Sequence, residues 1–331
     1  MMSLKELSEL RGVSGQEEAV RNYIIDEIKD FSDIYWTDSI GNLYVRPEKE
    51  NEASIGLFAH MDEVGMMVTG IDKHLLHFDT VGGINQELLP GTKVLVGRSE
   101  IPGVIGCPPI HLQEKEEREI KVPMKDLRID IGEQGPNVRI GDMVTFDTPY
   151  RERRGIAIGK AFDDRIGCHC LINAIKNGKG AGCVFVFTTQ EEAGLRGARV
   201  AADNVDLDWA IACEGTFALD QPGMPEQDRM PKMGGGPVIT IADRSVISDR
   251  KLIDIIVSAA DEERLTYQFK RPFAGGTDAG MVHLSKRGVP SCVISNPCRY
   301  IHSPCALASI NDIEKTSKLI GATIKRIKEV K

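Results

Sequence analysis

The sequence predicts an α/β protein, in which a mainly parallel sheet is sandwiched by helices and a small β-barrel-like domain is inserted. Two observations lead to this fold class. Apolar runs of strand length alternate with helical patterns in much of the chain, which is typical of parallel sheets. Between residues 68 and 148 the helical period disappears, and short β-like runs are separated by Gly, Pro and Asp turns. We therefore expect a discontinuous main domain formed by residues 1–66 and 158–331, with residues 67–157 as the inserted β-domain.

The first residues predict helices, then a hairpin, then a buried strand. Residues 3–31 have the pattern helix, turn, helix, and Ser14 and Glu17 have the spacing of a capping box before the second helix. Residues 34–45 are typical of a hairpin. The apolar run 55–59 that follows predicts a strand buried on both faces. This strand leads directly into the inserted domain.

The inserted domain contains one strongly charged stretch, QEKEERE, at residues 113–119. Runs of charge are usually solvated. We therefore expect a loop in water at this point and no recognition element.

The second half of the chain returns to alternating strands and helices. Residues 160–177 predict a turn followed by a helix. Further strands are expected at 182–189, 209–213, 238–242, 266–270 and 290–295, and further helices at 248–264, 278–286 and 312–330. The glycine-rich turn at 274–280 lacks the pattern of a phosphate-binding loop.

Composition and charge exclude several classes of function. A net charge of −8, with no basic stretch interleaved with aromatic residues, argues against a nucleic-acid partner. No run approaches the roughly 18 apolar residues of a membrane span and no signal core is visible, so we expect no membrane partner and a cytoplasmic location. The eight cysteines include no CxxC pair and lie mostly in apolar patterns, which favours buried, reduced thiols.

Side chains that commonly bind metals follow the predicted strands or open a helix. His60 and Asp62 end the first buried strand, where side chains two residues apart point the same way. One ring nitrogen of His60 could then bind a metal while Asp62 steadies the other. Four further groups also follow a predicted strand or open a helix: Asp163-Asp164, Glu191-Glu192, Glu214 and His302. Because sites in open α/β sheets form outside the carboxyl ends of the strands, we expect these five clusters to meet.

This mixture of side chains suits a pair of divalent ions. Two His and three carboxylates can hold two ions if one carboxylate bridges them, and ions about 3.5–4 Å apart can polarise a carbonyl and supply hydroxide. A further carboxylate must take and return the proton. Glu191 and Glu192 would point to different sides in extended backbone, so that one can bind metal and the other can face the substrate. The same divergence weakens a glycosidase pair, whose two carboxyls must face each other.

Six short motifs occur in order along the chain. They are HMDEVG at 60–65, AFDDR at 161–165, QEEAG at 190–194, EGT at 214–216, GGTDAG at 275–280 and RYIHSP at 299–304. Together they resemble the dinuclear-metal aminopeptidases that include the glutamyl, deblocking and tetrahedral aminopeptidases, some of which are labelled endoglucanases. The resemblance spans nearly the whole chain and includes the inserted β-domain.

The resemblance implies two divalent metal ions per subunit, zinc or cobalt, and five ligands. These are His60, Asp163, Glu192, Glu214 and His302. Asp163 would bridge both ions; it is preferred to Asp164 because the first acid of this pair bridges in related metallopeptidases. One ion would also be held by His60 and Glu214, and the other by the remaining two ligands. Position 214 is Asp in many relatives, and Glu reaches one methylene further.

The resemblance also implies roles for residues that bind no metal. Glu191 would be the general base and acid, and Asp62 would orient His60. Thr277 or Asp278 would lie near the amine of the peptide. The β-domain would mediate homo-oligomerisation, with dimers assembling into a tetrahedral dodecamer, and would gate substrate entry.

These inferences predict a metal-dependent aminopeptidase that hydrolyses the first peptide bond of short peptides through a two-metal-activated hydroxide. Two functions of other classes stay open. One is a glycoside hydrolase of the endoglucanase type, as the label on some relatives suggests. The other is a non-catalytic assembly or binding protein that uses the metals for stability.

Overall fold

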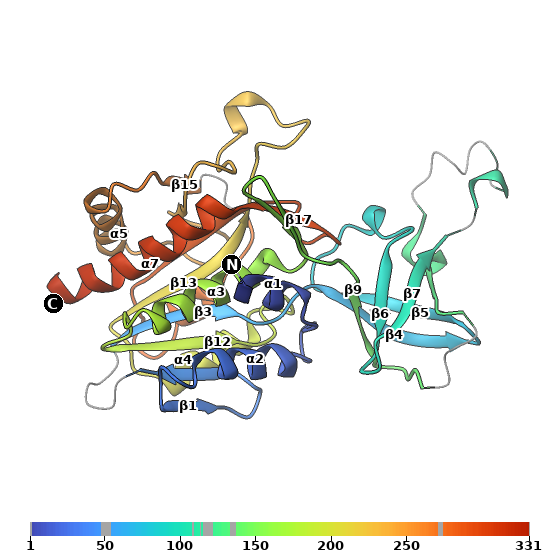
Figure 1. Cartoon of the computed structure of the whole chain (residues 1–331), viewed down its shortest axis with the longest axis horizontal. Coiled ribbons are helices and arrows are strands. Elements are labelled where there is room, and N and C mark those ends of the chain that lie inside the picture. Colours follow the sequence, from blue (N-terminus) through green and yellow to red (C-terminus); the bar gives the residue numbers. More distant parts are fainter. Residues whose placement is uncertain are drawn as a thin grey trace.

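The computed structural model describes residues 2–47, 54–107, 109–112, 114, 122–132, 137–270 and 274–330. Within them the chain forms a large α/β domain and a β-barrel that stands to one side of it (Figure 1). The α/β domain is built on an 11-stranded sheet, and the barrel is closed by six strands. The charged stretch at 113–119 lies outside the described residues, apart from Glu114.

The large sheet is parallel at its centre and antiparallel at both margins. In order across the sheet, its strands are β1 (Ile34–Thr37), β2 (Leu43–Arg46), β12 (Cys183–Thr188), β3 (Ile55–His60), β13 (Trp209–Phe217), β16 (Ser291–Arg299), β17 (Ala306–Ser309), β11 (Ile156–Gly159) and β10 (Arg151–Arg153). The four strands from β12 to β16 run parallel. β14 (Val238–Thr240) pairs with β16, and β15 (Gln268–Lys270) pairs with β14. Every residue of β3 is buried, as the sequence predicts.

Helices cover both faces of this sheet. α1 (Met2–Glu9), α2 (Glu18–Ile28), α3 (Phe162–Lys176), α5 (Arg250–Glu262) and α7 (Ile310–Val330) share one apolar core with the sheet. α4 (Arg196–Asn204) and α6 (Ala279–Val282) contribute to a second core. Alternate residues of β12 enter the two cores: Phe185 and Phe187 face the first, and Val184 and Val186 face the second.

The barrel has its own small core and follows the order β4-β5-β8-β7-β6-β9. Its strands are β4 (Gly65–Asp72), β5 (Leu75–Val81), β6 (Lys93–Val96), β7 (Ile101–Gly106), β8 (Arg128–Asp130) and β9 (Met143–Phe146). Short 3₁₀ turns lie at Gln86–Leu88, Ile110–Leu112 and Met124–Asp126 in this part of the chain. A further 3₁₀ turn, Glu226–Asp228, lies between β13 and β14 of the large sheet. The barrel strands thus lie within 65–146, while β10 and β11 belong to the large sheet. The α/β class with an inserted β-barrel is confirmed.

The predicted capping box before α2 is wrong. The N-cap residue is Glu17, and no side chain caps the helix there. Ser14 donates its hydroxyl to Asp62 Oδ2 at 2.6 Å instead. The carboxylate of Glu17 accepts hydrogen bonds from the backbone N–H groups of Gly15 at 2.7 Å and Gln190 at 3.0 Å. Both side chains are therefore used in contacts with distant parts of the chain.

Several element boundaries also differ from the sequence prediction. The helix expected over 278–286 is only α6, because the chain turns back after it: Val289 N–H bonds to the carbonyl of His283 at 3.1 Å. β13 and β16 each extend four residues further than expected, so Glu214 lies inside a strand. None of the helices in the described part of the chain is long and apolar enough to cross a membrane.

Candidate active site

The predicted site residues meet at the carboxyl ends of the central strands. His60 ends β3, Glu214 lies in β13, and the Glu191-Glu192 pair follows β12. Asp163 stands at the start of α3, and His302 follows β16. All five predicted metal ligands and Glu191 line one cleft of about 480 Å³. The convergence that the sheet topology predicts is therefore present.

Asp163 lies between the two histidines. Its Oδ1 is 3.4 Å from His60 Nε2, and its Oδ2 is 3.5 Å from His302 Nε2. Asp164 is oriented differently: its fully buried carboxylate accepts hydrogen bonds from the backbone N–H groups of His60 at 3.2 Å and Gly167 at 2.8 Å. Of the two acids, only Asp163 thus presents its oxygens to both imidazoles.

His302 is oriented by the inserted barrel. Its Nδ1 lies 2.9 Å from the carbonyl oxygen of Gly83, in the loop after β5. Since a carbonyl only accepts, Nδ1 carries a proton, and Nε2 is the nitrogen that can bind an ion once it has lost its own proton. That Nε2 faces Glu192 Oε1 at 3.3 Å as well as Asp163.

Asp62 holds both His60 and the loop that carries the two glutamates. His60 Nδ1 lies 3.2 Å from the Asp62 backbone oxygen and 3.4 Å from Oδ1. The backbone N–H groups of Glu191 and Glu192 donate to Asp62 Oδ1 and Oδ2 at 2.9 and 3.1 Å. This second role was not visible in the sequence, because it depends on a contact with a segment more than a hundred residues away.

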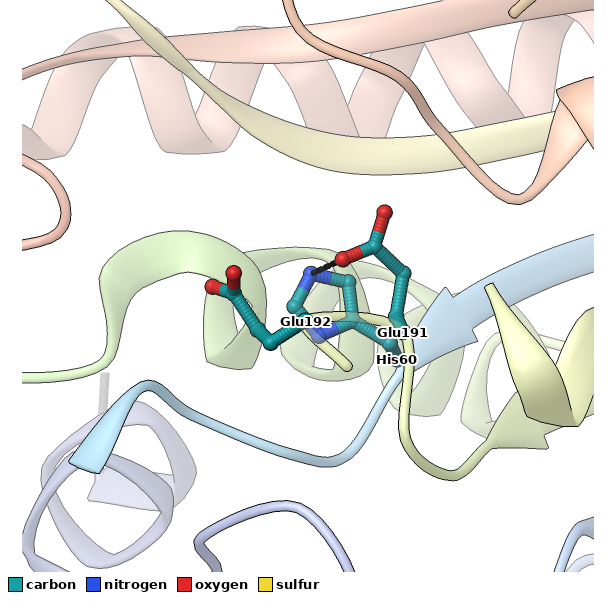
Figure 2. Close-up of side chains that lie close together, drawn as sticks. All are labelled: His60, Glu191 and Glu192. Atoms are coloured by element: carbon teal, nitrogen blue, oxygen red, sulfur yellow. Dashed lines mark ion pairs between the residues drawn. The ribbon is translucent and has the colours of Figure 1, made fainter. Parts of the chain in front are cut away.

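Glu191 and Glu192 lie in a bend and a turn, so the expected extended backbone is wrong. Their carboxylates nevertheless diverge: Glu191 Oε2 lies 3.9 Å from His60 Nε2, and the carboxylate of Glu192 lies on the other side of the imidazole ring (Figure 2). Donor atoms of His60, Glu191 and Glu192 lie within 4.8 Å of one another, and so do those of Asp163, Glu192 and His302. Glu214 lines the same cleft but is in neither group.

Of the two predicted substrate residues, Thr277 and Asp278, only Thr277 is part of the cleft wall. Asp278 is buried; its backbone N–H donates to Glu214 Oε1 at 3.2 Å, and its carboxylate accepts a hydrogen bond from Thr188. The other carboxylate oxygen, Oδ1, has no hydrogen-bond partner among the described residues.

The donor set fits divalent cations. Imidazole nitrogens together with carboxylate oxygens suit zinc and its first-row neighbours. Burial raises the pKa of Glu192 to about 7 and that of Glu191 well above its usual range, and neighbouring carboxylates add to both shifts. Burial lowers the pKa of His302, but Asp163 and Glu192 outweigh it and raise the value to about 9. Crowded carboxylates of this kind are stabilised by bound cations.

A buried ion cluster behind the cleft was missed by sequence reasoning. Glu63 accepts hydrogen bonds from Lys160 Nζ at 2.7 and 2.8 Å, and Arg165 Nη2 lies 3.6 Å away. Arg165 also donates from Nε to the Met61 carbonyl at 2.9 Å. The only sign of this cluster in the sequence is that Glu63 and Arg165 lie in the same short motifs as predicted metal ligands. The cluster fixes the segment between His60 and the barrel.

Comparison with known proteins identifies the family. The family model for M42 glutamyl aminopeptidases matches residues 41–319. A putative aminopeptidase of Acetivibrio thermocellus is 38% identical over 329 residues, which are 97% of each chain. The lysyl aminopeptidase of Pyrococcus furiosus is 31% identical, over 98% of this chain and 96% of its own.

Solved structures agree. The TET aminopeptidase from the marine sediment archaeon Thaumarchaeota archaeon SCGC AB-539-E09 superposes with a TM-score of 0.94 at 34% identity, covering 99% of this chain and 96% of its own. The Pyrococcus horikoshii TET1 peptidase, described as assembling into a tetrahedron or a large octahedral shell, has a TM-score of 0.86 at 36% identity, covering 97% and 98%. A Thermotoga maritima protein titled endoglucanase has a TM-score of 0.81 at 36% identity, covering 99% and 98%. The chain therefore belongs to the M42 glutamyl aminopeptidase family of peptide hydrolases.

Proposed function

We propose that this protein is an aminopeptidase that removes N-terminal residues from short peptides with the help of two divalent ions, zinc or cobalt. The observation that carries the proposal is the position of Asp163. Its two carboxylate oxygens face two different imidazoles at 3.4 and 3.5 Å, as a bridging ligand requires. This arrangement also supports Asp163 rather than Asp164 as the bridge.

The remaining ligands divide between the two ions. His60 and Glu214 would hold one ion with Asp163, and Glu192 and His302 would hold the other. When bound, such a pair polarises a carbonyl and lowers the pKa of a water molecule. Asp62 keeps His60 in place through its contacts with Nδ1, which leaves Nε2 directed into the cleft.

Glu191 is the proposed general base and acid. It takes a proton from the attacking water and delivers it to the leaving amine. Two features support this role: Glu191 lines the cleft, and burial raises the pKa of its carboxylate well above the usual range, which suits a group that must take up and release a proton. Asp62 fixes the Glu191 backbone at 2.9 Å.

The peptide amine would lie at the part of the wall formed by Thr277, with Asp278 buried behind it. Thr277 lines the cleft, and Asp278 has one carboxylate oxygen without a partner among the described residues. An ammonium group there would be attracted by Asp278 and Glu214. The scissile bond would then lie toward the two histidines.

The inserted barrel is the proposed module for oligomerisation and substrate gating, with dimers assembling into a tetrahedral dodecamer. The P. horikoshii TET1 peptidase, which can assemble into a tetrahedron or a large octahedral shell, supports such an assembly. Gly83 supports a role near the substrate, because the loop after β5 reaches from the barrel into the cleft. Sedimentation of the purified chain would test the assembly.

A glycoside hydrolase is the second candidate, because a 36% identical structure is titled endoglucanase. The two activities differ in their response to metal removal. Release of amino acids from peptides should stop with a chelator and return with zinc or cobalt. Chelator-resistant release of reducing sugar from cello-oligosaccharides would support the rival instead.

The variant Glu191→Gln tests the proposed function directly. It should keep two ions per chain and the wild-type melting temperature, yet lose activity on aminoacyl-anilides by roughly 10²–10⁴-fold, because the proton acceptor is gone. Gln190→Ala is the matched control, since the neighbouring side chain lies outside the cleft lining. Near-normal turnover by Glu191→Gln would reject the assignment.

A further inference from the structure

The loop that carries the proposed base is held in place by side chains. Four consecutive backbone N–H groups, at residues 189–192, each donate to a side-chain oxygen. Because these oxygens come from three distant segments, the loop depends on tertiary contacts for its position. The acceptors are Asn42 Oδ1 for Thr189 at 2.9 Å, Glu17 Oε1 for Gln190 at 3.0 Å, and Asp62 Oδ1 and Oδ2 for Glu191 and Glu192 at 2.9 and 3.1 Å.

The backbone of Gln190 needs such support. Its φ is +54°, in the left-handed region that residues other than glycine seldom adopt. Such a residue stays in this region only when the surrounding structure holds it there. The hydrogen bond from its N–H to Glu17 provides that hold, one residue before Glu191. A shift of the backbone at Gln190 would therefore displace the carboxylate of Glu191.

Glu17 is a fixed acceptor. Only 4% of this residue is exposed. Its Oε1 also accepts the N–H of Gly15 at 2.7 Å, which ties the carboxylate to its own turn. Burial, together with the negative charge of Asp62, raises the pKa of Glu17 above its usual value. The surroundings thus disfavour the charge of Glu17 while they use its oxygen as an acceptor.

Glu17 acts from outside the cleft. It is not among the described residues that line the cleft with the predicted ligands. It lines a second cavity of about 520 Å³, which Met143 of the barrel also lines. Ser14, three residues earlier, donates to Asp62 Oδ2 at 2.6 Å. One turn of the N-terminal segment therefore supports the loop twice, directly through Glu17 and indirectly through Asp62.

We propose that Glu17 is a positioning residue for the proposed base. Its oxygen fixes the backbone at Gln190, and this places the carboxylate of Glu191 where it takes the proton of the attacking water. The proposal rests on the proposed role of Glu191 and adds to it a residue that does not touch the substrate. It requires that the reach of the Glu17 side chain matters and that its charge does not.

Two conservative variants separate reach from charge. Glu17→Gln keeps an oxygen at the same distance along the side chain and removes the charge, whereas Glu17→Asp keeps the charge and withdraws the oxygen by one methylene. With the metal-loaded enzyme and Leu-anilide, we expect Glu17→Gln to retain the wild-type kcat. Glu17→Asp should lose roughly 10–10²-fold in kcat, because small displacements of a catalytic group have large effects. Both variants should keep the wild-type KM and two ions per chain.

The opposite order would overturn the proposal. If Glu17→Gln loses activity and Glu17→Asp keeps it, Glu17 acts through its charge. A rise in KM or a loss of metal in Glu17→Asp would also overturn it, since Glu17 would then support the substrate wall or the ligands. The neighbouring Glu18 is the matched control, because it has the same side chain but is exposed. Glu18→Asp and Glu18→Gln should leave kcat and KM unchanged.

A double variant tests whether Glu17 acts through Glu191. Glu191→Gln alone removes the proton acceptor, so the addition of Glu17→Asp should cause no further loss of turnover. Such non-additivity is typical of residues that act as a unit. If Glu17→Asp reduces turnover as much in the Glu191→Gln background as in the wild type, the proposal fails, because Glu17 would then support the cleft in a general way.

Hydrogen exchange separates this proposal from the proposed function, because it needs no turnover. The amides of residues 189–192 should exchange faster in Glu17→Asp than in the wild type, and at the wild-type rate in Glu17→Gln. Faster exchange together with normal turnover by Glu191→Gln would reject Glu191 as the base while supporting the hold of Glu17 on the loop. Unchanged exchange in Glu17→Asp, with Glu191→Gln inactive, would reject the role of Glu17 alone.

Discussion

The α/β domain and the barrel contribute to the cleft in different ways. In the described part of the chain, every side chain in the two candidate metal-binding groups comes from the α/β domain. The barrel contributes a backbone oxygen, Gly83 O, which fixes His302 at 2.9 Å. It also contributes the hydroxyl of Thr145, which donates to Glu63 at 3.1 Å. The α/β domain supplies the candidate metal-binding side chains, and the barrel fixes the position of some of them.

This division follows from the two architectures. Parallel strands end together at one edge of a sheet, so loops from several strands converge there. A closed antiparallel barrel has no such edge; its turns point both ways, and its interior is filled by its own core. A barrel can therefore help a site mainly by reaching over it with a loop, as the Gly83 loop does.

The largest predicted loss of metal and activity should come from replacing a candidate metal ligand of the α/β domain. Asp163→Asn removes charge from a group that faces both histidines, and we expect less than one ion per chain and a loss of activity on the order of 10³-fold. Metal analysis after gel filtration, together with anilide turnover, measures this. Asp164→Asn is the matched control: it should keep two ions and lower the stability by about 1–3 kcal/mol, because Asp164 only accepts backbone hydrogen bonds. Metal loss in the control alone would reverse the two assignments.

A smaller effect, on the free energy of unfolding, is expected where the α/β domain and the barrel join. Among the described residues, Lys160→Met leaves Arg165 as the only cation beside the buried Glu63, and breaking such a pair typically costs about 3–5 kcal/mol. Lys176→Met removes a partly exposed pair with Glu27 and should cost about 0–1 kcal/mol. Denaturant unfolding of both variants gives the difference. If the two losses are equal, Glu63 and Lys160 do not hold the segment between His60 and the barrel.

The same comparison explains which features were predictable from the sequence. Ligand-type residues that directly follow apolar strands can be recognised because strand ends in a parallel sheet meet. His60, Glu191, Glu192 and His302 were found in this way, and the structure brings them together. The barrel was predictable from the loss of helical period and from its turn residues.

Features that depend on distant pairs were not predictable. Ser14 and Glu17 have the spacing of a local cap, yet both bond to segments far along the chain. The burial of Lys270 in the wall of the cleft depends on three strands, β14, β15 and β16, that the sequence does not place side by side. The spacing of residues along the chain predicts only hydrogen bonds between near neighbours in sequence. A buried charge is recognised only when the residues packed around it are known.

The smallest predicted effect is a loss of folding stability at low pH, caused by a buried histidine of the α/β domain. His169 of α3 is buried there between Ser3 and Asn173, at 2.7 and 3.0 Å. Burial lowers the pKa of His169 from 6.5 to about 4, so the folded protein keeps the ring neutral while the unfolded chain protonates it. The stability is fully present above pH 6.5 and is lost as the pH falls toward 4, by up to about 3 kcal/mol. None of the described histidines of the barrel is buried.

Denaturant unfolding of the wild type and of His169→Gln between pH 7.5 and pH 4 would measure this effect. Glutamine stays neutral over this range, so the stability difference between the two proteins should change in favour of the variant as the pH falls. Metal release affects both proteins alike and cancels in the difference. Hydrogen exchange should show protection lost in α3 before the barrel strands. A stability difference that does not change with pH would mean that His169 is protonated in the folded protein as readily as in the unfolded chain.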